Sequence, residues 1–161
     1  MKKIDNAMLD ILTAQAKESP RRRANYNLHS KLDDPVNRLC IAMEPETYVR
    51  PHCHVDQQTW EVLVILRGKL ALLIFDNEGR VLERTVLTAG GAIPAVEFPE
   101  DTWHATISLE PGTVVFEVKK GPYVRPGERS VAPWAPAEGT ADAARLLDWY
   151  RHAAVGDRWG G

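Results

Sequence analysis

Eight short apolar or alternating segments, separated by turn residues, occupy the chain from Arg38 to Lys119. The turns between them are rich in glycine, proline, aspartate and asparagine, as at residues 76–79 and 89–91. Short strands at this spacing, with no helical pattern between them, are typical of an antiparallel sandwich or barrel. The sequence therefore predicts an all-β fold with strands at residues 38–43, 48–54, 61–66, 70–75, 81–87, 93–98, 104–109 and 113–119.

Apolar side chains recur at helical spacing near both ends of the chain. We expect a helix over residues 5–18 with Asp5 as its N-cap, and a second over residues 140–152 capped by Thr140. Residues 120–139 are rich in proline and glycine but carry Tyr123 and Trp134, which favours an ordered surface wrap over a disordered linker. A chain of 161 residues built this way is expected to be a single domain, residues 1–161, with its β-barrel at 38–119.

Two of the expected strands, residues 61–66 and 70–75, are apolar on both faces. A strand with one face in solvent would alternate instead, so both faces should be covered by a helix, by the second sheet or by another subunit. A homodimer is the economical interpretation of this pattern.

Charge and composition exclude several classes of partner. The net charge of −2 provides no basic field for nucleic acid, and no window reaches 18 uninterrupted apolar residues, so no membrane span is expected. Only two cysteines occur, Cys40 and Cys53, which favours a reduced, cytoplasmic setting over a disulfide framework.

The residues with the clearest chemistry are His52, His54, Glu61 and His104. In a strand, residues two apart point the same way, so the imidazoles of His52 and His54 can converge on one cation. Glu61 begins the next expected strand, and His104 follows a turn containing Pro99. Imidazole and carboxylate groups suit divalent transition metals, so this set predicts a metal site. By the same alternation Cys53 points away and is not a ligand.

The arrangement His52-x-His54, Glu61-x6-Gly68 and Pro99-x4-His104 resembles the two-motif signature of the cupin superfamily. The resemblance implies a jelly-roll (double-stranded β-helix) barrel in which His52, His54, Glu61 and His104 bind one metal. Six residues separate His54 from Glu61, where cupins usually have three or four. Gln58 stands at the usual offset and is the alternative ligand to Glu61. Asp101 also departs from the usual glycine, and Ser108 from the usual asparagine.

The chain further resembles the WbuC family of cupin-fold metalloproteins over nearly its whole length. The resemblance is carried by Arg50-Pro-His-x-His54 before Trp-Glu, by Trp-His at 103–104, by Phe-Glu-Val-Lys and Gly-Pro-Tyr at 116–123, and by Asn-Leu-His at 27–29. That family is associated with bacterial surface-polysaccharide (O-antigen, lipopolysaccharide) gene clusters, and its reaction is not defined.

Four protein ligands leave coordination positions open, which is the mark of a catalytic rather than a structural metal site. The sequence does not choose among iron, zinc, manganese and nickel. We expect a metal-binding cupin that acts on or binds a small polar or anionic metabolite; the alternative is a non-catalytic, metal-dependent binding protein or sensor.

Five further residues are candidates for contact with a substrate. Arg50 and Tyr48 share the expected histidine face, so either can bind a substrate, and Arg50 is also a catalytic candidate. Trp103 can pack against a sugar or an organic acid. Glu117 is unusual within an apolar strand and is a candidate base. His29 is a weaker candidate for the site.

Overall fold

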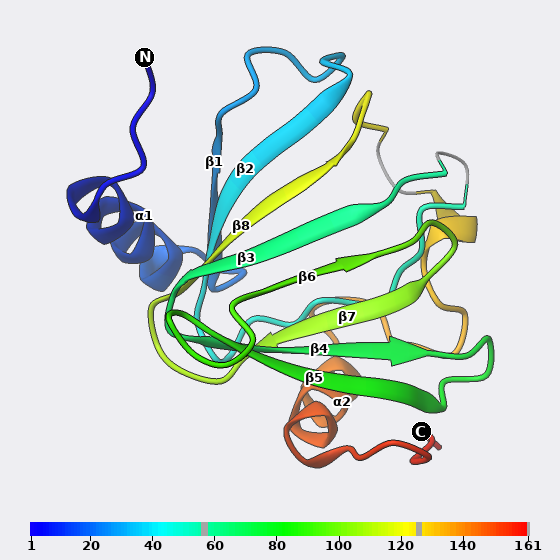
Figure 1. Cartoon of the computed structure of the whole chain (residues 1–161). Helices are drawn as coiled ribbons and strands as arrows, with labels where there is room; N and C mark the ends of the chain where they lie inside the picture. The colour runs from blue at the N-terminus through cyan, green and yellow to red at the C-terminus, as the bar shows by residue number, and fades with distance from the viewer. Residues whose placement is uncertain (56–57, 125–126, 161) are drawn as a thin grey trace.

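The computed structural model describes residues 1–55, 58–124 and 127–160. Two antiparallel sheets face each other and flare apart at one end, with one helix on the outside of each (Figure 1). The elements are α1 (Asn6–Glu18), β1 (Arg23–Asn27), β2 (Val36–Met43), β3 (Glu61–Arg67), β4 (Lys69–Phe75), β5 (Val81–Thr88), β6 (Ala95–Phe98), β7 (Trp103–Ser108), β8 (Thr113–Lys120), the 3-10 turn η1 (Glu128–Ser130) and α2 (Ala141–His152).

Strand pairing produces the nested order of a jelly roll. The larger sheet has the order β1-β2-β8-β3-β6, and the smaller has the order β5-β4-β7. Consecutive strands β3 and β4 lie in different sheets, and each pairs with the corresponding member of the later pair, β8 and β7. This confirms the predicted all-β class with jelly-roll topology. Among the described residues no strand pairing joins the two sheets, so the jelly roll is a sandwich of two sheets that hydrogen bonds do not close at the sides.

Both terminal helices follow the prediction. Asp5 accepts a hydrogen bond from the Met8 N–H, and Thr140 accepts one from the Ala143 N–H, so each helix begins at the expected cap. Helix α1 buries Leu9, Leu12 and Ala16 against the outer face of the larger sheet. No helix in the described part of the chain is long and apolar enough to cross a membrane.

Helix α2 explains why β4 is apolar on both faces. The outward side chains Leu73 and Phe75 pack with Leu146 and Tyr150 of α2, whereas Leu72 and its neighbours face the core between the sheets. The protein's own C-terminal helix therefore covers this strand. The pattern of β4 does not require a second subunit, and the homodimer stays a prediction.

Two features of the fold differ from the sequence prediction. Residues 48–54 do not form a strand; they belong to the connection between β2 and β3, in which only His52 makes an isolated bridge. The strand β1 was not predicted, because its sequence Arg-Ala-Asn-Tyr-Asn is largely polar and contains only two apolar side chains, Ala24 and Tyr26. It is an edge strand that exists through its antiparallel pairing with β2.

Candidate metal centre and adjoining cavity

The connection between β2 and β3 brings His52 beside His104 of β7. The two residues lie opposite each other and exchange both backbone hydrogen bonds, with N–O distances of 3.0 and 2.9 Å. Directly opposite residues of an antiparallel pair present their side chains on the same face. The ring centroids of His52 and His104 are accordingly 4.2 Å apart.

The proline-rich segment after β8 supports the other side of this connection. The Cys53 N–H donates to the Ser130 carbonyl at 2.9 Å, and the Ala132 N–H donates to the Pro51 carbonyl at 2.9 Å. Residues 51–53 are thus held between β7 and residues 130–132. The expected surface wrap therefore supports the histidine segment directly, although no regular strand forms there.

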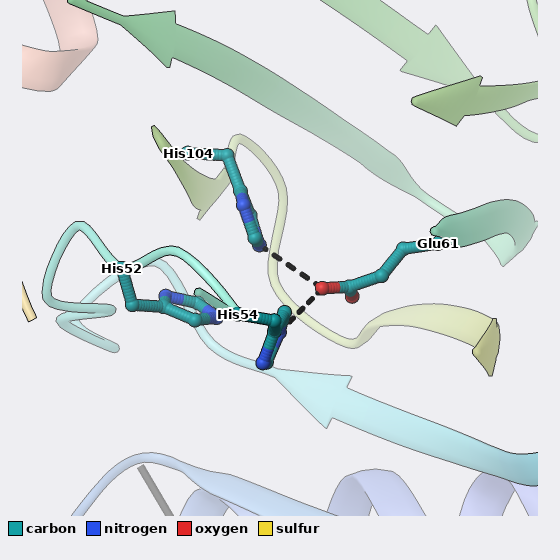
Figure 2. A group of neighbouring side chains, drawn as sticks. All are labelled: His52, His54, Glu61 and His104. Carbon is teal, nitrogen blue, oxygen red and sulfur yellow. Dashed lines mark ion pairs between the residues drawn. The ribbon is translucent and has the colours of Figure 1, made fainter. Parts of the chain in front are cut away.

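His54 and Glu61 complete a compact cluster with these two histidines (Figure 2). One ligand atom of each of the four residues lies within 4.8 Å of the others. The Glu61 carboxylate, from the first residue of β3, lies 2.5 Å from His54 Nε2 and 3.5 Å from His104 Nε2. The side chains of Glu61, His104 and His54 are buried, and that of His52 is partly exposed.

Backbone carbonyls determine which imidazole nitrogen is free. Nδ1 of His52 lies 3.0 Å from the Arg50 carbonyl, and Nδ1 of His104 lies 2.9 Å from the Thr102 carbonyl. A carbonyl can only accept, so each Nδ1 carries the proton and each Nε2 presents a lone pair to the cluster. A second bond that orients the ring in this way is the usual support of a metal-binding histidine.

Burial controls the protonation of the cluster. Burial, with a further contribution from His104, lowers the pKa of His52 well below its ordinary value. Burial likewise lowers the pKa of His104. Burial raises the pKa of Glu61, but the adjacent imidazoles and the Lys119 ammonium outweigh it, so the net pKa lies below the ordinary value. Neutral imidazoles beside a carboxylate are the forms that bind a metal ion.

The donor set fits a divalent ion. Metal–nitrogen and metal–oxygen bonds are about 2.0–2.2 Å, so ligand atoms of one ion are at most about 4.4 Å apart, and small shifts bring this cluster into range. His54 Nε2 and Glu61 Oε1 are fully buried, yet neither has a well-formed hydrogen bond among the described residues despite their short separation. Buried polar atoms are normally satisfied, and a shared cation would satisfy both.

The cluster opens into a cavity of about 300 Å³ between the two sheets. Three members of the cluster, His52, Glu61 and His104, line the cavity. Apolar side chains such as Leu39 and Leu63 line part of the wall, and polar side chains from β1, β2, β7 and β8 line other parts. Thr106 lines the cavity with His104, whereas Ala105 and Ile107 pack in the outer core, as the alternation in β7 predicts.

Residues 4–87, just over half of the chain, match the model of a protein family described as a domain of unknown function, DUF6016. The chain belongs to this family. No curated protein matches the sequence significantly.

Solved structures resemble this DUF6016 chain in fold. A Thermus thermophilus protein, TT1209, is 16% identical with a TM-score of 0.52, over 74% of this chain and 97% of its own. The conserved SPY1581 protein of unknown function from Streptococcus pyogenes is 12% identical with a TM-score of 0.51, over 76% and 90% of the two chains. A cupin superfamily protein from Desulfitobacterium hafniense is 12% identical with a TM-score of 0.48, over 61% and 76%.

The fourth residue of the cluster in this DUF6016 protein is Glu61 rather than Gln58. Gln58 is exposed, whereas Glu61 is 2% exposed and lies among the three histidines. The long segment after His54 thus ends with the acid inside the site. Cys53 is buried and free, and it is not a member of the cluster, as expected.

Three expected substrate contacts lie elsewhere. Arg50, Tyr48 and Trp103 are not among the residues that line the cavity. The Arg50 guanidinium donates to the Ala132 carbonyl, the Tyr48 hydroxyl donates to the Pro136 carbonyl, and Trp103 Nε1 donates to Asn77 Oδ1. The prediction for Arg50 and Tyr48 rested on strand alternation, which fails because residues 48–54 do not form a strand.

Glu117 and His29 do line the cavity. Glu117 Oε1 pairs with Lys119 Nζ at 2.9 Å, and both side chains are largely buried. Burial alone would lower the pKa of Lys119, but Glu117 and Glu61 raise it above its ordinary value, so the side chain is a cation. Sequence reasoning missed Lys119 and Asn37 as wall residues; the two-residue spacing of Glu117 and Lys119 could have indicated the first.

Proposed function

We propose that this protein is a metal-dependent cupin that binds a small anionic metabolite beside the His52, His54, Glu61 and His104 cluster and acts on it. The observation that carries the proposal is that this cluster opens into a cavity of about 300 Å³, large enough for a metabolite and lined by polar groups. The resemblance to the WbuC family supports a role in surface-polysaccharide sugar metabolism, and the presence of only two cysteines favours the cytoplasm.

The charges of the cavity wall favour an anion. Glu61 and Glu117 contribute two negative charges, and Arg23 and Lys119 contribute two positive charges, so the wall sums to zero with neutral imidazoles. A divalent ion in the cluster would leave an excess of positive charge in a buried space. An anionic ligand would neutralise that excess, which favours carboxylates or phosphates over neutral metabolites.

The residues of the site suit proton transfer next to a metal-bound ligand. A divalent ion would supply Lewis acidity or a bound hydroxide. Glu117 is the base candidate: Lys119 engages its Oε1, so its other carboxylate oxygen is the atom that would receive a proton. Lys119 holds that carboxylate in place, and the apolar side chains around the cavity limit the entry of water.

Metal content and turnover test the proposal. We expect a stoichiometric divalent ion in the protein purified without chelator and in Gln58→Ala, and its loss in Glu61→Gln. We also expect turnover of a member of a panel of sugar nucleotides and sugar acids, and loss of that turnover in Glu117→Gln with metal content unchanged. Full metal content in Glu61→Gln would contradict the proposed centre.

The alternative is a metal-dependent binding protein without turnover. In that case a panel member would raise the melting temperature of the metal-loaded protein, and no product would form over long incubation. That outcome would retain the site and remove the catalytic role of Glu117.

A further inference from the structure

Asn37 of β2 is a buried polar side chain in the cavity wall without a partner in the described protein. It is 2% exposed and lines the cavity. Neither Nδ2 nor Oδ1 has a hydrogen-bond partner among the described residues. Burying an amide without hydrogen bonds is unfavourable, and buried polar groups are nearly always satisfied. An amide that faces a cavity in this way points to a ligand group that satisfies it.

The strand register relates Asn37 to the metal centre. Glu61 of β3 lies opposite Lys119 of β8, and Lys119 lies opposite Asn37 of β2. These residues form one row across three neighbouring strands, and all three line the cavity. Adjacent strands are about 4.8 Å apart, so the backbone of Asn37 lies about 10 Å from that of Glu61. A ligand of several atoms can span from the cluster to the Asn37 amide.

The chemistry of the row indicates which groups the ligand carries. The Asn37 amide offers both a donor and an acceptor, so a hydroxyl group, which also does both, satisfies it better than a carboxylate, which only accepts. Lys119 has three donors, of which Glu117 engages one, so the middle of the row can donate to further oxygen atoms. The anionic end of the ligand belongs at the cluster, where the charge of a divalent ion would attract it.

We propose that Asn37 is a specificity-determining residue that binds a distal hydroxyl group of a hydroxylated carboxylate whose acid group lies at the metal centre. This inference rests on the proposed metal-dependent function. It narrows the ligand to polyhydroxy acids about six carbon atoms long.

Three probes of matched size test the ligand class by calorimetry on the protein loaded with Zn²⁺. D-gluconate carries both the acid and the hydroxyls, hexanoate carries only the acid, and D-glucitol carries only the hydroxyls. We expect gluconate to bind at least about tenfold more tightly than either of the others. Equal affinity for gluconate and hexanoate, or no binding of gluconate, would overturn the inference.

Asn37→Leu tests the residue itself. The substitution keeps a similar volume and removes both polar atoms, so we expect gluconate affinity to fall about tenfold and hexanoate affinity to stay the same. Thr59→Val is the matched control, because Thr59 Oγ1 is also buried without a partner among the described residues but does not line the cavity. Unchanged gluconate affinity in Asn37→Leu would overturn the inference.

Thermal unfolding of the metal-free protein separates a ligand role from a structural one. If the Asn37 amide forms its hydrogen bonds only with a bound ligand, the melting temperature of Asn37→Leu should equal or exceed that of the parent protein. The substitution removes a polar group that is unsatisfied in the ligand-free state. A clearly lower melting temperature would assign Asn37 to the stability of the fold and overturn the inference. Zn²⁺ titration of the same variants distinguishes the two proposals. Failure to bind Zn²⁺ contradicts the metal centre. Normal Zn²⁺ binding, with equal affinities for the three probes, contradicts only the role of Asn37.

Discussion

His52 and His104 lie opposite each other and exchange both of their backbone hydrogen bonds, at 3.0 and 2.9 Å. This pairing joins the connection before β3 to β7 and places two imidazoles on one face. The backbone alone makes these bonds, so replacing a side chain leaves them in place. The geometry of the site and the chemistry of its ligands can therefore be tested separately.

His104→Ala tests the chemistry. We expect the affinity for a divalent ion to fall by more than about 100-fold, since loss of supporting contacts alone costs 10–100-fold in metal sites. The fold should persist because the bridge to His52 is a backbone interaction. Competition with a chelator measures the affinity, and circular dichroism checks the fold.

His152→Ala is the control for this experiment. His152 is an exposed residue at the end of α2, so its loss should leave the affinity unchanged. Equal affinities of His104→Ala and the parent protein would remove His104 from the metal centre.

A large part of this site could be predicted from the sequence because its members are chemically distinctive. Three histidines and a glutamate stand out in a β-rich chain, and the period-two alternation of β7 puts His104 and Thr106 on the cavity face. Alternation failed at Arg50, because the bonds to residues 130–132 hold that segment as an irregular connection. No local pattern could indicate that contact between distant segments.

Asn37 is a second residue whose place in the site could not be predicted from local sequence. Alternation puts Asn37 on the face of Leu39, Ile41 and Met43, but no sequence pattern shows that this face lines a cavity. Its place in a row with Lys119 and Glu61 follows from the register of β2, β8 and β3, which is set by tertiary packing. Likewise, β1 forms a strand because it pairs with the edge of the sheet at β2. Its own residues do not favour a strand.

Gly68 should be the most sensitive position of the turn between β3 and β4. Its φ of +75° lies in the left-handed region, and a Cβ there would lie 2.6 Å from Thr113 Oγ1. The backbone conformation alone costs about 1–2 kcal/mol for a residue with a Cβ, and overpacking against Thr113 adds about 1–3 kcal/mol. Gly68→Ala should lower the free energy of unfolding by the sum, measured by chemical denaturation.

Gly90→Ala isolates the first contribution, the cost of the backbone conformation. Gly90 has a φ of +65°, but a Cβ there would meet nothing within 4 Å. Its loss of stability should be confined to the backbone cost. Equal losses in Gly68→Ala and Gly90→Ala would show that Thr113 moves aside freely.

The effects of replacing Glu117 and Lys119 on the free energy of unfolding should depend on each other. Lys119→Met leaves the Glu117 carboxylate largely buried without its cation. We expect this to lower the free energy of unfolding by on the order of 3 kcal/mol. This value is at the lower end for buried ion pairs because both side chains keep some exposure. Adding Glu117→Gln should restore most of the loss. A double-mutant cycle by urea denaturation measures the coupling, and additive losses would contradict it.

The stability of the metal-free protein should fall as the pH drops below about 6.5, the ordinary pKa of histidine. The pKa values of His52 and His104 are lowered in the folded state, so in this range the unfolded chain binds protons that the folded chain does not. Stability then rises with pH, by up to about 1.4 kcal/mol per pH unit for each histidine. Denaturation in the presence of a chelator, between about pH 8 and about pH 5.5, measures the slope. The double variant His52→Gln/His104→Gln should have a shallower slope, whereas His152→Ala should keep the parent slope. Parallel curves for the parent protein and the double variant would show that these two imidazoles are not buried in the neutral form.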